Sequence, residues 1–265
     1  MTAKRVLAAL VGLAIIVPLI LFGGVGAIVL LVTVAGVIAT IEYAHMAFPD
    51  DSTVMSVVQV VAVGVTCAAA LFWPGHAGLT SIGVVCGILV LQTFRPGADL
   101  DRTADRAGRV FVGVGWLSLF AFVVLLRREE HGLSWVFLVL SIAWLGDTGA
   151  YFAGRFLGRT PLYERISPKK TWEGVVGGVV LATAGMLVVR EIGDLPLTIG
   201  QCLVGGPILT LTGVVGDLCE SMLKRSFSVK DSGWIMPGHG GLLDRVDSVL
   251  FVAPWLYAWV RFLEI

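Results

Sequence analysis

Polar residues concentrate in one stretch of this chain, 224 to 248, which reads KRSFSVKDSGWIMPGHGGLLDRVDS. The residues directly before it, GDLCESM, carry polar side chains at spacings of three and four, which is typical of one face of a helix. The side chains on that predicted face are Asp217, Glu220, Ser221 and Lys224. The face would therefore present carboxylate, hydroxyl and ammonium groups together.

Two further carboxylates, Asp244 and Asp247, follow a glycine-rich turn, and a helix that begins near Leu242 would place both on one side. The turn PGHGG is not regular helix, because Pro237 lacks an N–H group and its glycines allow backbone angles closed to other residues. Such a turn, leading into a helix, offers free N–H groups and a positive dipole end to an anion. Carboxylates on both flanks suit an oxygen-preferring cation such as Mg²⁺. The stretch predicts a site that holds a metal and a polyphosphate together.

A second polar cluster lies in AWLGDTGAYFAGRFLGRTPLYERISPKKTWEG, where Asp147 falls inside or near the end of an apolar run. An ionisable residue at such a position usually faces the interior of a helix bundle or a water-filled cavity. The residues at the entrance of the next apolar run are Ser167, Lys169, Lys170, Thr171 and Glu173. Alternatively, the two lysines only anchor the chain at the membrane surface, and Asp147 is a paired structural carboxylate.

The composition indicates that these clusters belong to a membrane protein. Hydrophobic residues make up 57% of the 265 residues and charged residues only 14%, and the mean hydropathy is +0.89. The apolar residues form nine runs, near 6–22, 25–41, 54–73, 77–93, 109–126, 133–152, 174–190, 197–216 and 249–263. A helix needs about 20 apolar residues to cross the hydrocarbon core, and hydrocarbon cannot satisfy open backbone groups. We therefore expect an all-α, polytopic fold with about nine transmembrane helices.

The distribution of cations predicts the orientation of this bundle. With nine spans, 15 of the 19 Lys and Arg residues fall on the side of the N-terminus. Short cytoplasmic loops are enriched in Lys and Arg, so the N-terminus and both polar clusters should face the cytoplasm. No long linker or repeat divides the chain, so 1–265 is expected to form a single membrane domain.

The stretch from Ser221 to Asp247 closely resembles the signature of the phosphatidate cytidylyltransferases (CDP-diacylglycerol synthases), which runs S-x-x-K-R, K-D, P-G-H-G-G and D-R-x-D. The segments GDTGAYFAGR and SPKKTWEG are also similar to that family. Met236 stands where the family usually has Leu, Ile or Phe, which is a small apolar change. The matched motifs lie in the C-terminal helices, 127–265, whereas the N-terminal helices, 1–126, carry none.

The resemblance implies a transferase reaction in which CTP and phosphatidate give CDP-diacylglycerol and pyrophosphate for phospholipid biosynthesis. The catalytic residues that it implies are Asp217, Lys224, Arg225, Lys230, Asp231, His239, Asp244, Arg245 and Asp247. The substrate-binding residues that it implies are Asp147, Ser167, Lys169, Lys170, Thr171, Glu173, Ser221, Gly240 and Gly241. Its implied metal ligands, for Mg²⁺ and with a second cation left open, are Asp217, Asp244 and Asp247.

The resemblance also suggests a homodimer in the plasma membrane, with membrane lipid and no nucleic acid as a partner. Two other functions stay open. One is a related CTP-dependent cytidylyltransferase that acts on another lipid phosphate, because the motif would be nearly unchanged. The other is a membrane transporter, although transporters usually place polar residues near the bilayer midplane. A P-loop enzyme is disfavoured, because the chain contains no G-x-x-x-x-G-K-[ST] motif.

Overall fold

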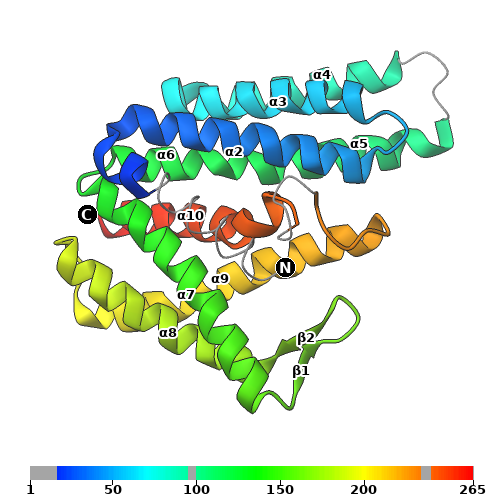
Figure 1. The fold of residues 1–265 in the computed structure, drawn as a ribbon. Helices are drawn as coiled ribbons and strands as arrows, with labels where there is room; N and C mark the ends of the chain where they lie inside the picture. Colours follow the sequence, from blue (N-terminus) through cyan, green and yellow to red (C-terminus); the bar gives the residue numbers. More distant parts are fainter. Residues whose placement is uncertain (1–16, 95–99, 234–239, 265) are drawn as a thin grey trace.

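The fold consists of long helices and one small hairpin (Figure 1). The computed structural model describes residues 17–94, 100–233 and 240–264. Its first helices are α2 (Gly24–Ala47), α3 (Ser52–Phe72), α4 (Ala77–Thr93), α5 (Leu100–Leu117) and α6 (Ala121–Arg128). The later helices are α7 (Gly132–Leu157), α8 (Trp172–Ile192), α9 (Ile199–Ser226) and α10 (Leu243–Leu263). Single 3₁₀ turns, Pro74–His76 and Ser118–Phe120, precede α4 and α6.

Seven helices of the described chain are long and apolar enough to cross a membrane. One of them is the continuous segment Arg102–Arg128, which combines most of α5 with α6. The expected run at 77–93 is also helical but shorter than the other seven. The run at 6–22 lies mostly outside the described residues, and only its part from 17 to 22 is seen to be helical. The protein is therefore a multi-pass helical membrane protein, while the count of nine spans stays a prediction.

The outer surface of the bundle carries large apolar side chains, as a bilayer requires. Phe22, Ile192 and Phe262 are 82–85% exposed, and many other Val, Leu and Ile side chains of the spanning helices also face outward. A helix in water would keep polar residues on its outer face. This outward apolar surface fits helices that hydrocarbon solvates on the outside.

Helix α10 lies at the centre of the fold, between α2 and α6 on one side and α7 and α9 on the other (Figure 1). Two clusters of buried apolar side chains form the core, and α10 contributes to both. Val252 and Leu256 pack in the cluster with α6, α7, α8 and α9. Leu243 and Leu250 pack in the cluster with α2, α3 and α5. Helix α10 thus packs against both halves of the chain.

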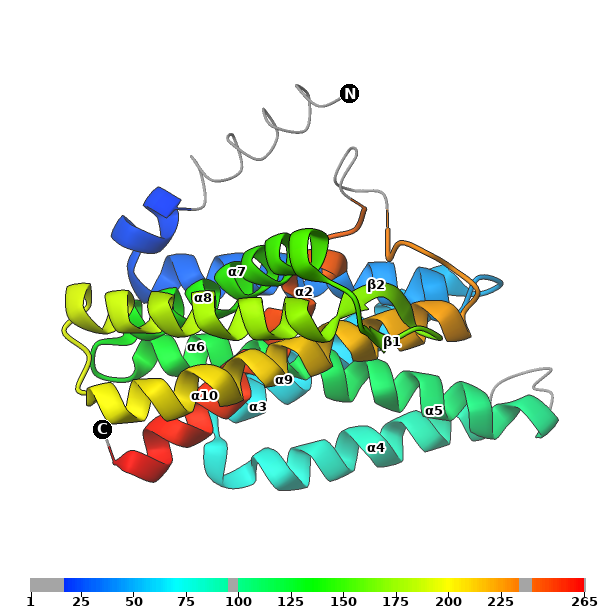
Figure 2. The same cartoon turned by 90° about the horizontal axis from the view of Figure 1, so that it is seen from below.

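Helices α7 and α8 pack closely along their length, as both views show (Figures 1 and 2). A Cβ atom on Gly149 would lie only 2.4 Å from the Gly177 carbonyl oxygen, and one on Gly177 would lie 2.2 Å from the Ala153 Cβ. Small residues allow this close approach of helix backbones, which is a common way to associate helices in membranes. The close packing places Asp147 of α7 next to the start of α8.

The described chain is almost entirely helical, as expected, and one small hairpin is added to the expected all-α fold. Strands β1 (Pro161–Tyr163) and β2 (Ser167–Thr171) pair antiparallel, with Pro161 opposite Thr171 and Tyr163 opposite Ser167. Helix α8 begins directly after β2, and the Thr171 hydroxyl caps it by accepting a hydrogen bond from the Gly174 N–H group at 3.1 Å. The SPKKT segment is therefore an ordered strand that leads into a capped helix.

Candidate active site

Three carboxylates from α9 and α10 meet where the two helices come closest. One oxygen each of Asp217, Glu220 and Asp247 lies within 4.8 Å of the others. Asp217 and Glu220 share a face of α9 because they are three residues apart. Gly216 lets α10 approach, since a Cβ atom there would lie only 2.8 Å from the Asp247 carbonyl oxygen. We refer to Asp217, Glu220 and Asp247 as the carboxylate cluster.

Two of the three carboxylates in the cluster are buried, Asp217 is half-buried, and the two lysines that contact the cluster neutralise it only in part. Glu220 is 1% exposed and Asp247 6% exposed. Two ammonium groups reach the cluster: Lys170 Nζ lies 2.5 Å from an Asp217 oxygen, and Lys224 Nζ lies 2.8 Å from Glu220 Oε2. Glu220 Oε1 has no hydrogen-bond partner among the described residues. A buried charged oxygen without a partner is costly, so its environment favours an added cation.

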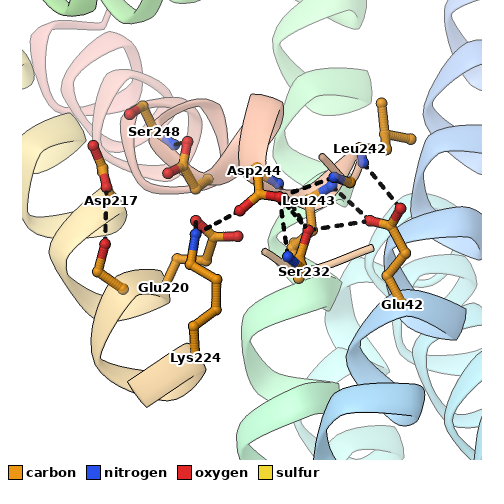
Figure 3. Close-up of polar contacts among 12 residues, drawn as sticks. Glu42, Asp217, Glu220, Lys224, Ser232, Leu242, Leu243, Asp244 and Ser248 are labelled. Carbon is orange, nitrogen blue, oxygen red and sulfur yellow. Dashed lines mark hydrogen bonds and ion pairs between the residues drawn. The ribbon is translucent and has the colours of Figure 1, made fainter. Parts of the chain in front are cut away.

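Asp244 lies beside the cluster rather than within it (Figure 3). Its Oδ1 atom is 2.5 Å from Lys224 Nζ. Its Oδ2 atom accepts hydrogen bonds from the Gly241 N–H group at 2.9 Å and from the N–H and hydroxyl groups of Ser232 at 3.0 and 2.8 Å. Asp244 and Asp247 both face α9, as the predicted helix requires. The contacts of Asp244 are with Lys224, Ser232 and the Gly241 N–H group. Of the two aspartates, only Asp247 joins the group whose oxygens could share one metal ion.

The two polar clusters of the sequence meet at one cavity. Its volume is about 240 Å³, and its polar lining comes from Asp147 and Tyr151 of α7, Lys169, Lys170 and Thr171 of β2, and Asp217 of α9. The ion pair between Lys170 and Asp217 joins this cavity to the carboxylate cluster. Asp147, which is costly inside an apolar run, thus lies on the wall of a cavity that two lysines also line.

Several predicted site residues have a local structural contact. Glu173 accepts hydrogen bonds from the Arg159 and Thr160 N–H groups and from the Thr160 hydroxyl at 3.0–3.3 Å, and so ties the hairpin to α8. Thr171 caps α8, Ser167 lies at the start of β2, and the Ser221 hydroxyl donates to Asp217 Oδ1 at 3.3 Å. These contacts position the neighbouring lysines and carboxylates.

Of the remaining predicted residues that the structure describes, four are exposed and Gly241 is buried. The exposed ones are Arg225, Lys230, Asp231 and Arg245. Gly240 has a φ of +82°, in the left-handed region that favours glycine, and a Cβ atom there would lie 2.8 Å from Asp244 Oδ2. His239 lies outside the described residues.

Sequence reasoning missed two residues of this region, Glu42 and Ser232. Glu42 of α2 is 3% exposed and accepts hydrogen bonds from the first N–H groups of α10. Ser232 links it to Asp244. Glu42 directly follows the apolar run 25–41, and a carboxylate beside such a run was the signal that could have indicated a buried partner.

Comparison with known proteins identifies the family. The profile of the cytidylyltransferase family matches residues 3–263. The chain belongs to this family. The phosphatidate cytidylyltransferase of Staphylococcus haemolyticus is 34% identical to this cytidylyltransferase over 257 residues, which cover 95% of this chain and 96% of the relative. That of Staphylococcus saprophyticus is 33% identical with the same coverage. That of Bacillus subtilis is 39% identical over 172 residues, 64% of each chain.

Proposed function

We propose that this protein is a phosphatidate cytidylyltransferase, which converts CTP and phosphatidate into CDP-diacylglycerol and pyrophosphate. Relatives with that name align with 95% of the chain. The observation that carries the proposal is the junction of the carboxylate cluster with a lysine-lined cavity, through the Lys170–Asp217 ion pair. Such a junction suits a reaction that brings two anionic phosphates together.

In the reaction, a phosphate oxygen of phosphatidate attacks the α-phosphorus of CTP. The bond from that phosphorus to the α,β-bridging oxygen breaks, and pyrophosphate leaves with that oxygen. The nucleophile is already an anion, so no strong general base is needed. The protein must instead hold two anions together and stabilise the charge on the leaving group, which is electrostatic work.

The residues present fit a divalent cation such as Mg²⁺. Carboxylate oxygens are its preferred protein ligands, and the cluster supplies three of them with one buried oxygen left unpartnered. The carboxylate cluster and Asp244 together supply four carboxylates, and the two lysines in ion pairs with them leave a formal excess of two negative charges within this set. We therefore assign the metal to Asp217, Glu220 and Asp247, and Asp244 stays a further predicted ligand. When bound, Mg²⁺ would neutralise phosphate charge and stabilise the leaving pyrophosphate.

The Lys and Arg side chains around the cluster would bind the phosphate groups of the substrates. Lys169 and Lys170 line the cavity. Lys224 is held between Glu220 and Asp244 at 2.8 and 2.5 Å, so its ammonium group is oriented before substrate arrives. Further phosphate-binding cations in this proposal are Arg225, Lys230 and Arg245. His239 would donate a hydrogen bond to phosphate from the glycine-rich turn.

The substrates come from two different phases. CTP is soluble in water, whereas phosphatidate lies in the bilayer, so a site at the ends of spanning helices can reach both. We place this site on the cytoplasmic face of the plasma membrane, because the cation-rich segments share its side. An N-terminus in the cytoplasm, about nine spans and a homodimer belong to the same proposal.

The test is an assay on the purified protein in lipid nanodiscs. With CTP, phosphatidate and Mg²⁺, we expect pyrophosphate release and a lipid product of the mass of CDP-diacylglycerol. GTP and dATP replace CTP as controls, and an ether-lipid phosphate replaces phosphatidate to test the related acceptor. Turnover of the ether lipid alone would contradict phosphatidate as the substrate, and no turnover with any acceptor would contradict the function.

A further inference from the structure

A buried carboxylate from the N-terminal half of the chain contacts the start of α10 (Figure 3). Glu42 of α2 uses both of its oxygens: Oε1 accepts from the Leu242 N–H group at 3.0 Å, and Oε2 accepts from the Leu243 N–H group at 2.9 Å. The partners are 200 and 201 residues apart in sequence. The contact therefore connects the half of the chain without a recognised motif to the helix that carries Asp244 and Asp247.

The position of Glu42 matches what a helix start requires. The first N–H groups of a helix have no partner within it, and the positive end of the helix dipole favours a negative charge there. The residue at the N-cap position of α10, Leu242, has an apolar side chain and provides no side-chain cap. Glu42 supplies the missing acceptor from another helix, and a charged acceptor makes a stronger hydrogen bond than a neutral one.

The surroundings of Glu42 are built to admit its carboxylate. A Cβ atom on Gly233 would lie 2.4 Å from Glu42 Oε1, and one on Gly241 would lie 2.6 Å from Glu42 Oε2. Gly233 and Gly241 thus leave room for one buried carboxylate. Since Gly241 was expected to bind substrate, its contact with Glu42 provides a second reason for glycine at that position.

A continuous set of polar contacts leads from Glu42 to the carboxylate cluster. The Ser232 hydroxyl lies 3.5 Å from Glu42 Oε2 and 2.8 Å from Asp244 Oδ2. Asp244 holds Lys224, which in turn contacts Glu220 of the cluster. Movement of the first turn of α10 would therefore displace Asp244 and Asp247 relative to α9.

We propose that Glu42 is a positioning residue of the transferase: it fixes the first turn of α10 so that Asp244 and Asp247 face α9. Both of its oxygens are occupied by backbone donors, and it lies outside the group of carboxylates that could share a metal. Glu42 acts through α10, not on the substrate. The inference rests on the proposed function for its effect on turnover, but the contact itself is tested separately.

The test compares Glu42→Gln with a control, Thr40→Val, in nanodiscs. The amide keeps the size of the carboxylate but has only one acceptor oxygen, so one of the two N–H groups would face an NH₂ group. Thr40 is buried on the same helix, and its hydroxyl donates a hydrogen bond to the Gly36 carbonyl oxygen of α2. Its replacement should leave α10 unchanged.

The first readout is amide hydrogen exchange in peptides that cover residues 240–248. Loss of a hydrogen bond to a buried charged group should accelerate exchange of the first α10 amides by about 10- to 100-fold in the Gln variant, with α7 and α8 unchanged. The second readout is turnover against Mg²⁺ concentration. The Gln variant should need more Mg²⁺ for half-maximal rate and turn over at least about 10-fold more slowly, while the Val control behaves as wild type.

Each outcome decides the matter. Exchange and Mg²⁺ response equal to wild type in Glu42→Gln would overturn the inference. Faster exchange in α7 and α8 as well would show a general structural role for Glu42 and would overturn the inference. A failure of both Glu42→Gln and Glu42→Asp to fold would overturn it in the same way. If wild-type turnover does not depend on Mg²⁺, the metal proposal fails, and faster exchange confined to α10 still supports the contact.

Discussion

Replacement of Asp247 by Asn should have opposite effects on stability and on activity. The carboxylate oxygens of the cluster lie within 4.8 Å of one another. Two unit charges at that distance repel by about 3.5 kcal/mol at an effective dielectric constant of about 20, so ionised Asp247 would experience about 7 kcal/mol from its two neighbours before Lys170 and Lys224 offset part of it. If the substitution removes only about 1 kcal/mol of this repulsion from the folded state, the melting temperature of the metal-free protein should rise by roughly 2–4 °C.

The same substitution should remove the response to metal. One preorganised electrostatic group is typically worth about 10²- to 10³-fold in turnover, and we expect a loss of at least that size for Asp247→Asn. Bound Mg²⁺ at about 100 times its dissociation constant should stabilise the wild type by about 2.7 kcal/mol. The variant should lack most of this stabilisation, because one of the three proposed ligands has lost its charge.

The assay measures thermal unfolding in detergent with EDTA or Mg²⁺, together with pyrophosphate release against Mg²⁺ concentration. Asp194→Asn is the matched control: Asp194 is exposed between α8 and α9, and its φ of +48° suits asparagine. Asp244→Asn provides a contrast, because it weakens hydrogen bonds to a charged lysine and should lower stability by about 1.5–3 kcal/mol.

The reasoning would be refuted if Asp247→Asn melted at a lower temperature than wild type in EDTA and kept the wild-type response to Mg²⁺. That result would show that the cluster is structural. Equal effects of the Asp244 and Asp247 substitutions on both readouts would instead support one site that both residues share, as the sequence alone suggested.

Two further predictions concern the lysines and the orientation. Lys170→Met should reduce turnover more than Lys169→Met, because only the Lys170 ammonium group is seen 2.5 Å from Asp217, and equal losses at limiting CTP would contradict this difference. In a cysteine-free background, Ser228→Cys should react with a membrane-impermeant thiol reagent only after the cytoplasmic face is opened. Asp194→Cys, which lies beyond the other end of α9, should react in intact cells. The reverse labelling pattern would show that the protein has the opposite orientation.

The sequence predicted the helices themselves and the contacts between residues on the same helix. Apolar runs predicted the helices, and the start expected near Leu242 agrees with α10 at Leu243. The spacing of Asp217, Glu220 and Lys224 predicted their common face on α9, where Lys224 now contacts Glu220. Helical periodicity suffices for such pairs, because residues three or four apart are neighbours whatever surrounds the helix.

Contacts between elements could not be read from the same patterns. The resemblance grouped Asp244 with Asp217 and Asp247 as metal ligands, yet the approach of α10 at Gly216 brings Glu220 together with Asp217 and Asp247 and leaves Asp244 beside them. The hairpin had no alternating apolar pattern, since β2 is mostly polar. Its position depends on contacts with the start of α8, such as the hydrogen bond from the Trp172 N–H group to the Thr160 carbonyl oxygen at 3.0 Å.

The arrangement around α10 explains why a short polar motif needs the apolar half of the chain. The motif supplies Asp244 and Asp247, but the Leu242 and Leu243 N–H groups at the start of the helix donate to Glu42 of α2. Leu243 is also buried in the core that α2, α3 and α5 form. Because the first turn of α10 is held by α2 and its inner face by α9, the distance between Asp247 and Glu220 depends on packing across both halves. Residues far from any motif can therefore change metal affinity without touching the metal.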